Sequence, residues 1–321
     1  MTKTRIAVIG AGAFGEHHAR VLRGLDGVDL VAVVDANLDR AREVAGRFGA
    51  EAAADYREVI GRVEAATVAA PTLLHAQIGE DLLQAGVDVL VEKPMAADLA
   101  GADRLVEAAR RQGRILQVGH LERFNPAVEE ASALARLPLF FEVHRMSVFT
   151  PRSLDIDVVL DLMIHDLDIV LSLVESPVRQ VHAVGLPVLS SQADIAHVRL
   201  QFENGCVANF TASRVSTERI RKLRYFQPRE YVTVDYSRQD GAVFGVGASN
   251  RIEFRPLAVT KGEPLERQMR AFVRSVQTRE PPAVGGQQGR RALEVALRIR
   301  EEMESHARVV AATMAAQGQG R

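Results

Sequence analysis

Two groups of side chains in this sequence could act as acid and base on a hydroxyl group. Lys93 follows an apolar run at residues 87–91 and precedes Pro94. A lysine at such a strand end can polarise an oxygen or lower the pKa of a hydroxyl. Asp161 and His165 lie four residues apart in an apolar helical run, so they share one helix face. The carboxylate would orient the imidazole and favour its protonated form, which makes His165 a candidate general base.

Each group also has a plainer interpretation when it is taken alone. Glu92, Lys93 and Pro94 could form an ordinary charged turn, and Asp161 and His165 could be a hydrogen-bonded pair in the core. The two groups become persuasive as catalytic residues only together, and alongside a site for a redox cofactor.

A glycine turn near the N-terminus predicts that cofactor site. Residues 10–15 have the pattern Gly-x-Gly-x-x-Gly, directly after a predicted strand and at the start of a predicted helix. The glycines permit a tight turn, approach of a pyrophosphate and close helix–strand packing, and the helix N-terminus attracts phosphate. We predict cofactor contacts in the turn and at neighbouring strand ends, from Gly10, Gly12, Ala13, Phe14, Gly15, Asp35, Ala70, Pro71, Thr72, His75, Glu92 and Lys93.

The choice between NAD and NADP depends on Asp35, which ends the next predicted strand twenty residues after Gly15. Its carboxylate can accept hydrogen bonds from both ribose hydroxyls and would repel a 2′-phosphate. Ala36 supplies no adjacent arginine for such a phosphate, so NAD is the predicted cofactor. Arg40 is close enough in sequence to keep NADP open as the alternative. Hydride chemistry needs no metal, and none is predicted.

Polar side chains elsewhere could hold a substrate. Arg123 and Asn125 follow the last strand of the N-terminal half and could face a sugar, whose reacting hydroxyl His165 would contact. Arginines of the second half could neutralise a diphosphate, and each could equally be a solvated surface charge. The predicted substrate contacts are Arg123, Asn125, Arg145, His165 and Arg214.

The elements that would position these residues fall into two domains. Short apolar strands alternate with helices up to about residue 119, which is typical of a doubly wound parallel sheet of the Rossmann type. The second half has a helix predicted at 156–174, then strands separated by turns, then two helices, which indicates an α+β domain with a largely antiparallel open sheet. We predict a Rossmann domain at 1–120 and a substrate-binding and oligomerisation domain at 121–321.

Composition excludes several classes of partner and location. Lys and Arg total 40 and Asp and Glu total 41, so the charge balance gives no reason to expect nucleic acid. No apolar stretch reaches about 18 residues, so no membrane span is predicted. The single cysteine, Cys206, has no second cysteine in the chain with which to form a disulfide. A chain without disulfides suits a cytoplasmic protein. We predict that Cys206 is a packing residue.

As a set, these motifs resemble the glucose–fructose oxidoreductase / inositol dehydrogenase family, and they occur in family order along nearly the whole chain. The matching motifs are the turn at 10–15, Asp35, and the segments 71–75, 92–94 and 161–165. The resemblance implies an NAD-dependent oxidoreductase that oxidises a sugar hydroxyl, with a catalytic group made by Lys93, Asp161 and His165. It also implies a C-terminal open sheet that joins subunits into a homodimer or homotetramer.

A narrower resemblance concerns the segments 119–126, 161–166 and 209–216. They look like bacterial members of the UDP-N-acetylglucosamine 3-dehydrogenase type, from the lipid A diamino-sugar branch, which implies a 3-keto nucleotide sugar as product. Inositol, a free aldose or a dihydrodiol remains open as the substrate. A non-catalytic NAD(H)-sensing regulator remains open as well, although the intact catalytic set argues against it.

Overall fold

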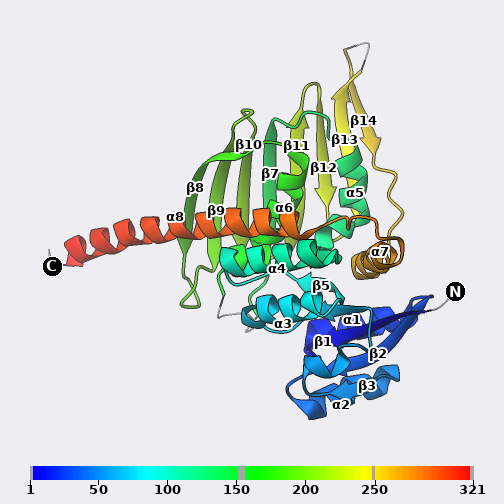
Figure 1. Cartoon of the computed structure of the whole chain (residues 1–321). Helices are drawn as coiled ribbons and strands as arrows, with labels where there is room; N and C mark the ends of the chain where they lie inside the picture. The colour runs from blue at the N-terminus through cyan, green and yellow to red at the C-terminus, as the bar shows by residue number, and fades with distance from the viewer. Residues whose placement is uncertain (1–2, 151–155, 248–249, 319–321) are drawn as a thin grey trace. The chain divides into compact units, whose positions relative to one another are not determined.

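The structure is a computed structural model that describes residues 3–150, 156–247 and 250–318. Its contacts divide the chain into two units, each built on one sheet (Figure 1). Unit 1 contains Met1–Phe124 and Gly262–Leu293, and unit 2 contains Asn125–Lys261 and Glu294–Arg321. The sequence prediction divided the chain once, at residue 120, and did not anticipate that a later segment returns to unit 1.

Unit 1 contains a six-stranded parallel sheet in the order β3-β2-β1-β4-β5-β6. The strands are β1 (Thr4–Ile9), β2 (Val28–Val34), β3 (Glu51–Ala53), β4 (Ala65–Val68), β5 (Asp88–Glu92) and β6 (Leu116–Gly119). The order reverses direction between β1 and β4, which creates the switch point where doubly wound sheets bind their ligands. The predicted Rossmann sheet is therefore confirmed.

The helices of unit 1 bury their apolar faces on this sheet. They are α1 (Ala13–Gly24), α2 (Leu38–Phe48), α3 (Thr72–Gln84), α4 (Leu99–Gln112) and α7 (Pro264–Thr278), with short 3-10 turns η1 (Tyr56–Val59) and η2 (Leu121–Phe124). From α7, Met269 and Phe272 are fully buried in one core with Ile6 and Leu22. This packing explains why α7 belongs to unit 1, although α7 is far in sequence from the other helices of that unit.

Unit 2 contains an eight-stranded sheet in the order β14-β13-β12-β11-β7-β10-β9-β8. All neighbours are antiparallel except β7 and β10, which run parallel. The strands are β7 (Phe140–Met146), β8 (Val178–Leu186), β9 (Ile195–Phe202), β10 (Val207–Ser213), β11 (Ile220–Gln227), β12 (Glu230–Asp235), β13 (Asp240–Val246) and β14 (Ile252–Pro256). The predicted largely antiparallel open sheet is confirmed.

One face of the second sheet is buried and the other is open. In β9, Ala196, Val198 and Leu200 are buried, whereas His197 and Arg199 between them are exposed. The helical elements of this unit are α5 (Pro126–Ala133), a π turn η3 (Val159–Met163), α6 (Ile164–Leu173) and most of α8 (Gly286–Gly318). Figure 1 shows α5, α6 and α8 in front of the strands.

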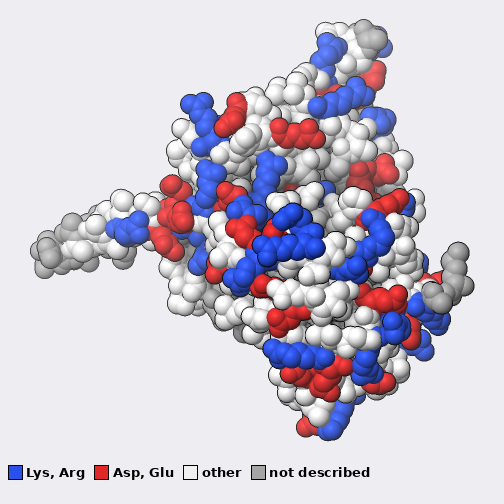
Figure 2. Space-filling view, viewed as in Figure 1, with Lys and Arg blue, Asp and Glu red and all other residues white. Residues whose placement is uncertain are grey.

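Positive and negative side chains alternate over the face of the molecule in Figure 2, with no large area of one sign. Among the described residues, no helix combines the length and the apolar character that a membrane span requires.

Candidate active site

The glycine turn between β1 and α1 has the geometry that a pyrophosphate requires. Gly10 has a φ of +102°, and a Cβ atom there would lie 2.6 Å from the carbonyl oxygen of Ala69. A Cβ atom on Gly15 would lie 1.7 Å from the carbonyl oxygen of Gly10, so only glycine allows this approach. At Gly12 a Cβ atom would meet nothing within 4 Å, and Gly12 caps α1 without a side-chain hydrogen bond. The start of α1 therefore offers backbone N–H groups and open space to an anion.

Asp35 lies at the end of β2 and is tied to this turn. Its Oδ2 accepts a hydrogen bond of 2.7 Å from the backbone N–H of Ala11, and its Oδ1 accepts one of 2.9 Å from the N–H of Asn37. Each carboxylate oxygen can accept more than one hydrogen bond, so the group can still bind ribose hydroxyls. Asp35 thus fixes the turn and also lines the adjacent cavity.

A cavity of about 780 Å³ lies beside Asp35 and is large enough for a nucleoside. Sequence reasoning missed the wall formed by η1 and by the outer side of α3, because these residues carry no motif. The cavity is lined by Ile9, Gly10, Gly12, Val34, Asp35, Ala36, Ala54, Asp55, Tyr56, Arg57, Ala69, Ala70, Pro71, Leu74, Gln77 and Ile78. Apolar walls next to the Asp35 carboxylate fit an adenosine, and the chain therefore has the residues to hold NAD.

Arg40, the residue that kept NADP open, is fully engaged. Its Nε donates to the carbonyl of Ala11 at 2.8 Å, its Nη2 to Glu16 at 2.6 Å and its Nη1 to Glu43 at 2.7 Å. The hydrogen bond from Arg40 lowers the pKa of Glu16, and Arg47 reinforces this effect. The guanidinium is therefore neutralised by two carboxylates, and it binds the carbonyl of Ala11 while Asp35 binds the N–H of the same residue.

Lys93 lies at the carboxyl end of β5, half-buried, and the bond between Lys93 and Pro94 is cis. Glu92 beside it is almost fully buried, and its Oε1 lies 3.2 Å from His18 Nε2. Burial acts to raise the pKa of Glu92, but His18 and the charge of Lys93 outweigh it, and the pKa is lowered. A Cβ atom on Gly119 would lie 2.5 Å from Glu92 Oε1, so this glycine makes room for the carboxylate. Glu92 thus supports the strand end from inside, and its predicted contact with the cofactor remains a prediction.

His75 joins two strand ends. Its Nε2 lies 2.7 Å from the carbonyl oxygen of Ala70, and its Nδ1 lies 2.9 Å from that of Pro94. The ring is 1% exposed, and burial lowers its pKa although both carbonyls act to raise it. His75 is therefore placed to fix the turn after Lys93, and its predicted contact with the cofactor remains a prediction. Pro71 and Thr72 form the start of α3 next to Ala70.

Ala13 and Phe14 are the first residues of α1, directly after the glycine turn. The Phe14 side chain is 47% exposed. Its ring packs edge-on against the buried His18 ring, with the two ring centroids 6.3 Å apart. The predicted cofactor contacts of Ala13, Phe14 and Thr72 remain predictions.

Asp161 and His165 lie in unit 2, where the predicted single helix at 156–174 is interrupted. Asp161 is in the π turn Val159–Met163, and His165 is in the first turn of α6. Both side chains are half-buried among buried apolar neighbours. A π turn widens the helix, and such turns are frequent at functional sites. Both groups therefore lie in one helical segment of unit 2, and their catalytic roles remain predictions.

Two arginines predicted to contact a diphosphate are instead buried and bound to carboxylates. Arg145 donates to Asp166 at 2.6 Å and 2.9 Å, and both side chains are at most 2% exposed. Arg214 donates to Asp194 at 2.8 Å, and their side chains are 6% and 0% exposed. Sequence reasoning missed these carboxylate partners, because no local pattern connects residues more than 19 positions apart. Both guanidinium groups are buried and already paired with carboxylates, which contradicts the diphosphate interpretation.

Asn125 also has a structural position. Its Oδ1 accepts a hydrogen bond from the N–H of Ala127 and so caps α5, and its Nδ2 donates to the carbonyl of Tyr236 at 3.0 Å. The residue is 2% exposed, so its amide is occupied within unit 2. Arg123 lies half-buried in η2 of unit 1, and its predicted contact with a sugar remains a prediction.

Within residues 3–150, 156–247 and 250–318, no group of three or more His, Cys, Asp or Glu side chains could hold a metal ion. Cys206 is buried at the β9–β10 turn, and burial raises the pKa of its thiol to about 11. The thiol is therefore neutral near pH 7 and serves as an apolar packing group, as predicted from the sequence.

Known proteins resemble this chain in both of its units. Residues 4–120 match the model of an oxidoreductase family with an NAD-binding Rossmann fold, and residues 139–229 match the GFO/IDH/MocA C-terminal domain. UDP-N-acetylglucosamine 3-dehydrogenase from Acidithiobacillus ferrooxidans is 34% identical over 95% of this chain and 99% of its own. A solved structure of that enzyme superposes with a TM-score of 0.90.

A second group of relatives acts on inositol. Myo-inositol 2-dehydrogenase from Thermotoga maritima is 27% identical over 94% of this chain and 96% of its own length. Inositol 2-dehydrogenase from Acidothermus cellulolyticus is 37% identical over 56% of each chain. The matches to both family models, to full-length relatives and to their fold lead to one conclusion: this chain belongs to the GFO/IDH/MocA family of NAD-binding Rossmann-fold oxidoreductases.

Proposed function

We propose that this protein oxidises the 3-hydroxyl of UDP-N-acetylglucosamine with NAD⁺ and forms a 3-keto nucleotide sugar. The observation that carries the proposal is the full-length similarity, in sequence and in fold, to the Acidithiobacillus ferrooxidans dehydrogenase named for that substrate. Partial matches to inositol dehydrogenases support the broader class, oxidation of a ring hydroxyl. A 3-keto product would suit an aminotransferase of a lipid A diamino-sugar branch, and we place the reaction in the cytoplasm.

In the proposed reaction the sugar carbon loses a hydride and its hydroxyl loses a proton, leaving a carbonyl. NAD⁺, when bound, would supply the hydride acceptor, and the start of α1 and Asp35 would hold its pyrophosphate and its ribose. His165 takes the proton from the hydroxyl oxygen, and Asp161 orients its ring. The ammonium group of Lys93 stabilises negative charge on the same oxygen as the proton leaves.

A substrate panel tests this proposal. Purified protein with NAD⁺ is given UDP-N-acetylglucosamine, UDP-glucose, myo-inositol, glucose or a dihydrodiol, and NADH absorbance is followed. We expect kcat/KM to be highest for UDP-N-acetylglucosamine. A preference for myo-inositol would replace the proposed substrate by the second candidate, which the Thermotoga maritima relative supports. Absence of turnover with every compound would favour a non-catalytic sensor of NAD(H).

Replacing Asp35 with serine tests the cofactor assignment. We expect NADH to bind at least about tenfold more weakly, because a charged hydrogen-bond acceptor contributes roughly 1.5–3 kcal/mol. NADPH should gain little, since Glu16 and Glu43 still hold Arg40. Adding Glu43→Gln should release part of Arg40 and improve NADPH binding over the single variant. Calorimetric titration with both nucleotides measures this. Tighter binding of NADPH than NADH by Asp35→Ser alone would show that Arg40 is available after all.

We also propose that the open face of the second sheet joins two copies of the chain. An aromatic ladder crosses this face, from Phe140 through Phe226, Tyr231 and Phe244 to Phe254, with neighbouring ring centroids 4.6–5.6 Å apart. Phe254 at its end is 63% exposed and Ile252 is 83% exposed, which leaves apolar surface to cover. Analytical ultracentrifugation should find at least a dimer, and a monomer would contradict this proposal.

A further inference from the structure

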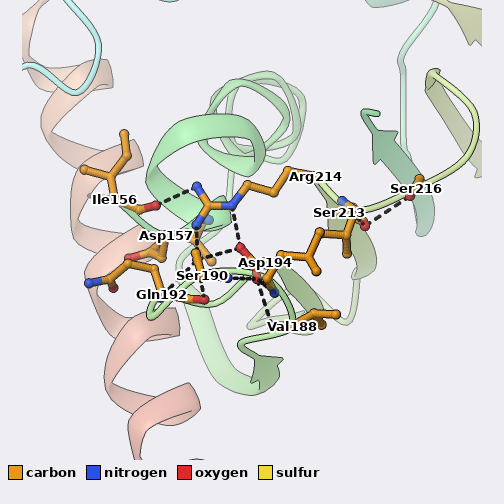
Figure 3. Close-up of polar contacts among 12 residues, drawn as sticks. Ile156, Asp157, Val188, Ser190, Gln192, Asp194, Ser213, Arg214 and Ser216 are labelled. Atoms are coloured by element: carbon orange, nitrogen blue, oxygen red, sulfur yellow. Dashed lines mark hydrogen bonds and ion pairs between the residues drawn. The ribbon is translucent and has the colours of Figure 1, made fainter. Parts of the chain in front are cut away.

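Arg214, directly after β10, has a buried guanidinium that donates to three acceptors in two separate segments of unit 2. Its Nε donates to Asp194 Oδ1 at 2.8 Å, its Nη1 to the carbonyl of Ile156 at 2.8 Å, and its Nη2 to Ser190 Oγ at 3.1 Å (Figure 3). We use the name Arg214 clamp for the group formed by Arg214, Asp194, Ser190 and the Ile156 carbonyl. Its three acceptors lie in the β8–β9 connection and just before the π turn.

Asp194 is held as a carboxylate within the clamp. Its Oδ2 accepts backbone hydrogen bonds of 2.6–2.9 Å from Val188, Leu189 and Ser190, and its Oδ1 also accepts from the Ser190 hydroxyl. Burial acts to raise the pKa of Asp194, but these hydrogen bonds and Arg214 lower it far below its usual range. The β8–β9 connection is therefore folded around one charged group.

The clamp leads directly to the helical segment that carries Asp161 and His165. Ile156 precedes Asp157, whose Oδ1 accepts hydrogen bonds from the N–H groups of Val159 and Leu160 at the start of the π turn. The N–H of Val158 donates to the carbonyl of Ala193, at 3.0 Å, beside Asp194. The clamp and this backbone bond thus attach the first residues of the segment to the β8–β9 connection.

We propose that the Arg214 clamp positions the segment that bears Asp161 and His165, and that Arg214 is a positioning residue and not a substrate ligand. The inference rests on the roles proposed above for Asp161 and His165. A buried ion pair is a poor source of net stability, since desolvation offsets its Coulomb energy, but it fixes geometry. A shift of about 1 Å in a catalytic group can lower turnover on the order of 100-fold, so geometry here has a large effect on rate.

Arginine is needed for this task because its planar guanidinium donates in several fixed directions at once. A lysine at position 214 would keep the positive charge beside Asp194, but its single ammonium group could not also serve the Ile156 carbonyl and Ser190 Oγ in the same geometry. The substitution Arg214→Lys therefore separates charge balance from positioning.

Hydrogen–deuterium exchange of the full chain, without substrate, tests the clamp independently of any activity. In Arg214→Lys we expect the amides of residues 158–165 to exchange about tenfold faster than in the wild type, with β10 and β7 unchanged. The milder variant Ser190→Ala, which removes one hydroxyl contact, should accelerate the same amides by a smaller factor. The matched control is Arg279→Lys in unit 1, where Arg279 binds Asp88 and the carbonyl of Gly113. It should leave residues 158–165 unchanged.

Kinetics then connects the clamp to the reaction. With whichever substrate the wild type turns over, Arg214→Lys should lower kcat about tenfold or more and leave the dissociation constant of NADH unchanged. Unchanged exchange at 158–165 in both clamp variants, or equal acceleration throughout unit 2, would overturn the inference. If the wild type turns over no sugar, the proposed function fails while the exchange experiment still decides the clamp.

Discussion

Replacing Lys93 with methionine is expected to lower kcat by about 10³-fold and to leave NADH affinity within about twofold. Methionine has nearly the length of lysine but no charge and no proton to donate, so the sugar oxygen loses its cationic partner. The cofactor contacts should survive, because the glycine turn, Asp35 and the adjacent cavity do not depend on the ammonium group. Steady-state kinetics and calorimetric titration of NADH measure the two quantities.

The control for this experiment is Lys261→Met, a change of the same type at an exposed position in unit 2. It should keep wild-type kcat and wild-type NADH affinity. Full activity of Lys93→Met would remove Lys93 from the mechanism. A parallel loss of NADH binding would instead make Lys93 a cofactor ligand whose effect on kcat is indirect.

Replacing Arg145 with methionine should lower the free energy of unfolding more than any other substitution proposed for this protein. It leaves Asp166 as a buried carboxylate without its guanidinium, and breaking a buried pair in this way costs about 3–5 kcal/mol. Arg145 Cζ also lies 5.2 Å from the centroid of the Tyr236 ring, and losing this cation–π contact destabilises the variant further. Equilibrium unfolding in urea should show an earlier transition for the variant.

Arg224→Met is the matched control, because Arg224 forms an ion pair on the exposed face of the same sheet. Arg224 lies 3.7 Å from Glu142, with side chains 48% and 38% exposed, and such a pair contributes at most about 1 kcal/mol. The double variant Arg145→Met/Asp166→Leu should recover much of the lost stability, since it removes both charges. Equal effects of Arg145→Met and Arg224→Met would show that Asp166 is not held as a buried ion.

The cofactor half of the site could be predicted from sequence because its chemistry is local. Gly10, Gly12 and Gly15 lie within one turn, and Asp35 ends the next strand, so the spacing alone carries their geometry. The position of Lys93 after a strand could be predicted for the same reason, since a polar residue after an apolar run marks a strand end. Regular alternation of strand and helix likewise predicted the Rossmann type of the first sheet.

What could not be predicted depends on contacts between distant segments. Arg145 and Arg214 are indistinguishable from surface charges until Asp166 and Asp194 are seen beside them. The amphipathic pattern of α7 shows an apolar face but not which core receives it. The dipeptide Asp240-Gly241 is typical of a hairpin turn, yet Asp240 pairs with Asp235 as part of β13, and the chain turns just before it.

The π turn belongs to the same class of misses. A run of apolar residues with Asp161 and His165 four apart predicts an α-helix, and nothing in that run reveals that the backbone bond at Ile164 reaches back five residues to Val159. The start of the segment is bound to Ala193 and to Arg214, which lie elsewhere in unit 2 and leave no local pattern in the sequence.

The most direct test of the central claim follows the hydride itself. UDP-N-acetylglucosamine that carries deuterium at C3 is incubated with NAD⁺ and the protein, and the reduced nucleotide is analysed by mass spectrometry. If the 3-hydroxyl is oxidised, deuterium should appear in the reduced nucleotide, and the rate should be lower than for unlabelled sugar. Reduced nucleotide without deuterium, or no reduction at all, would contradict oxidation at the 3-hydroxyl.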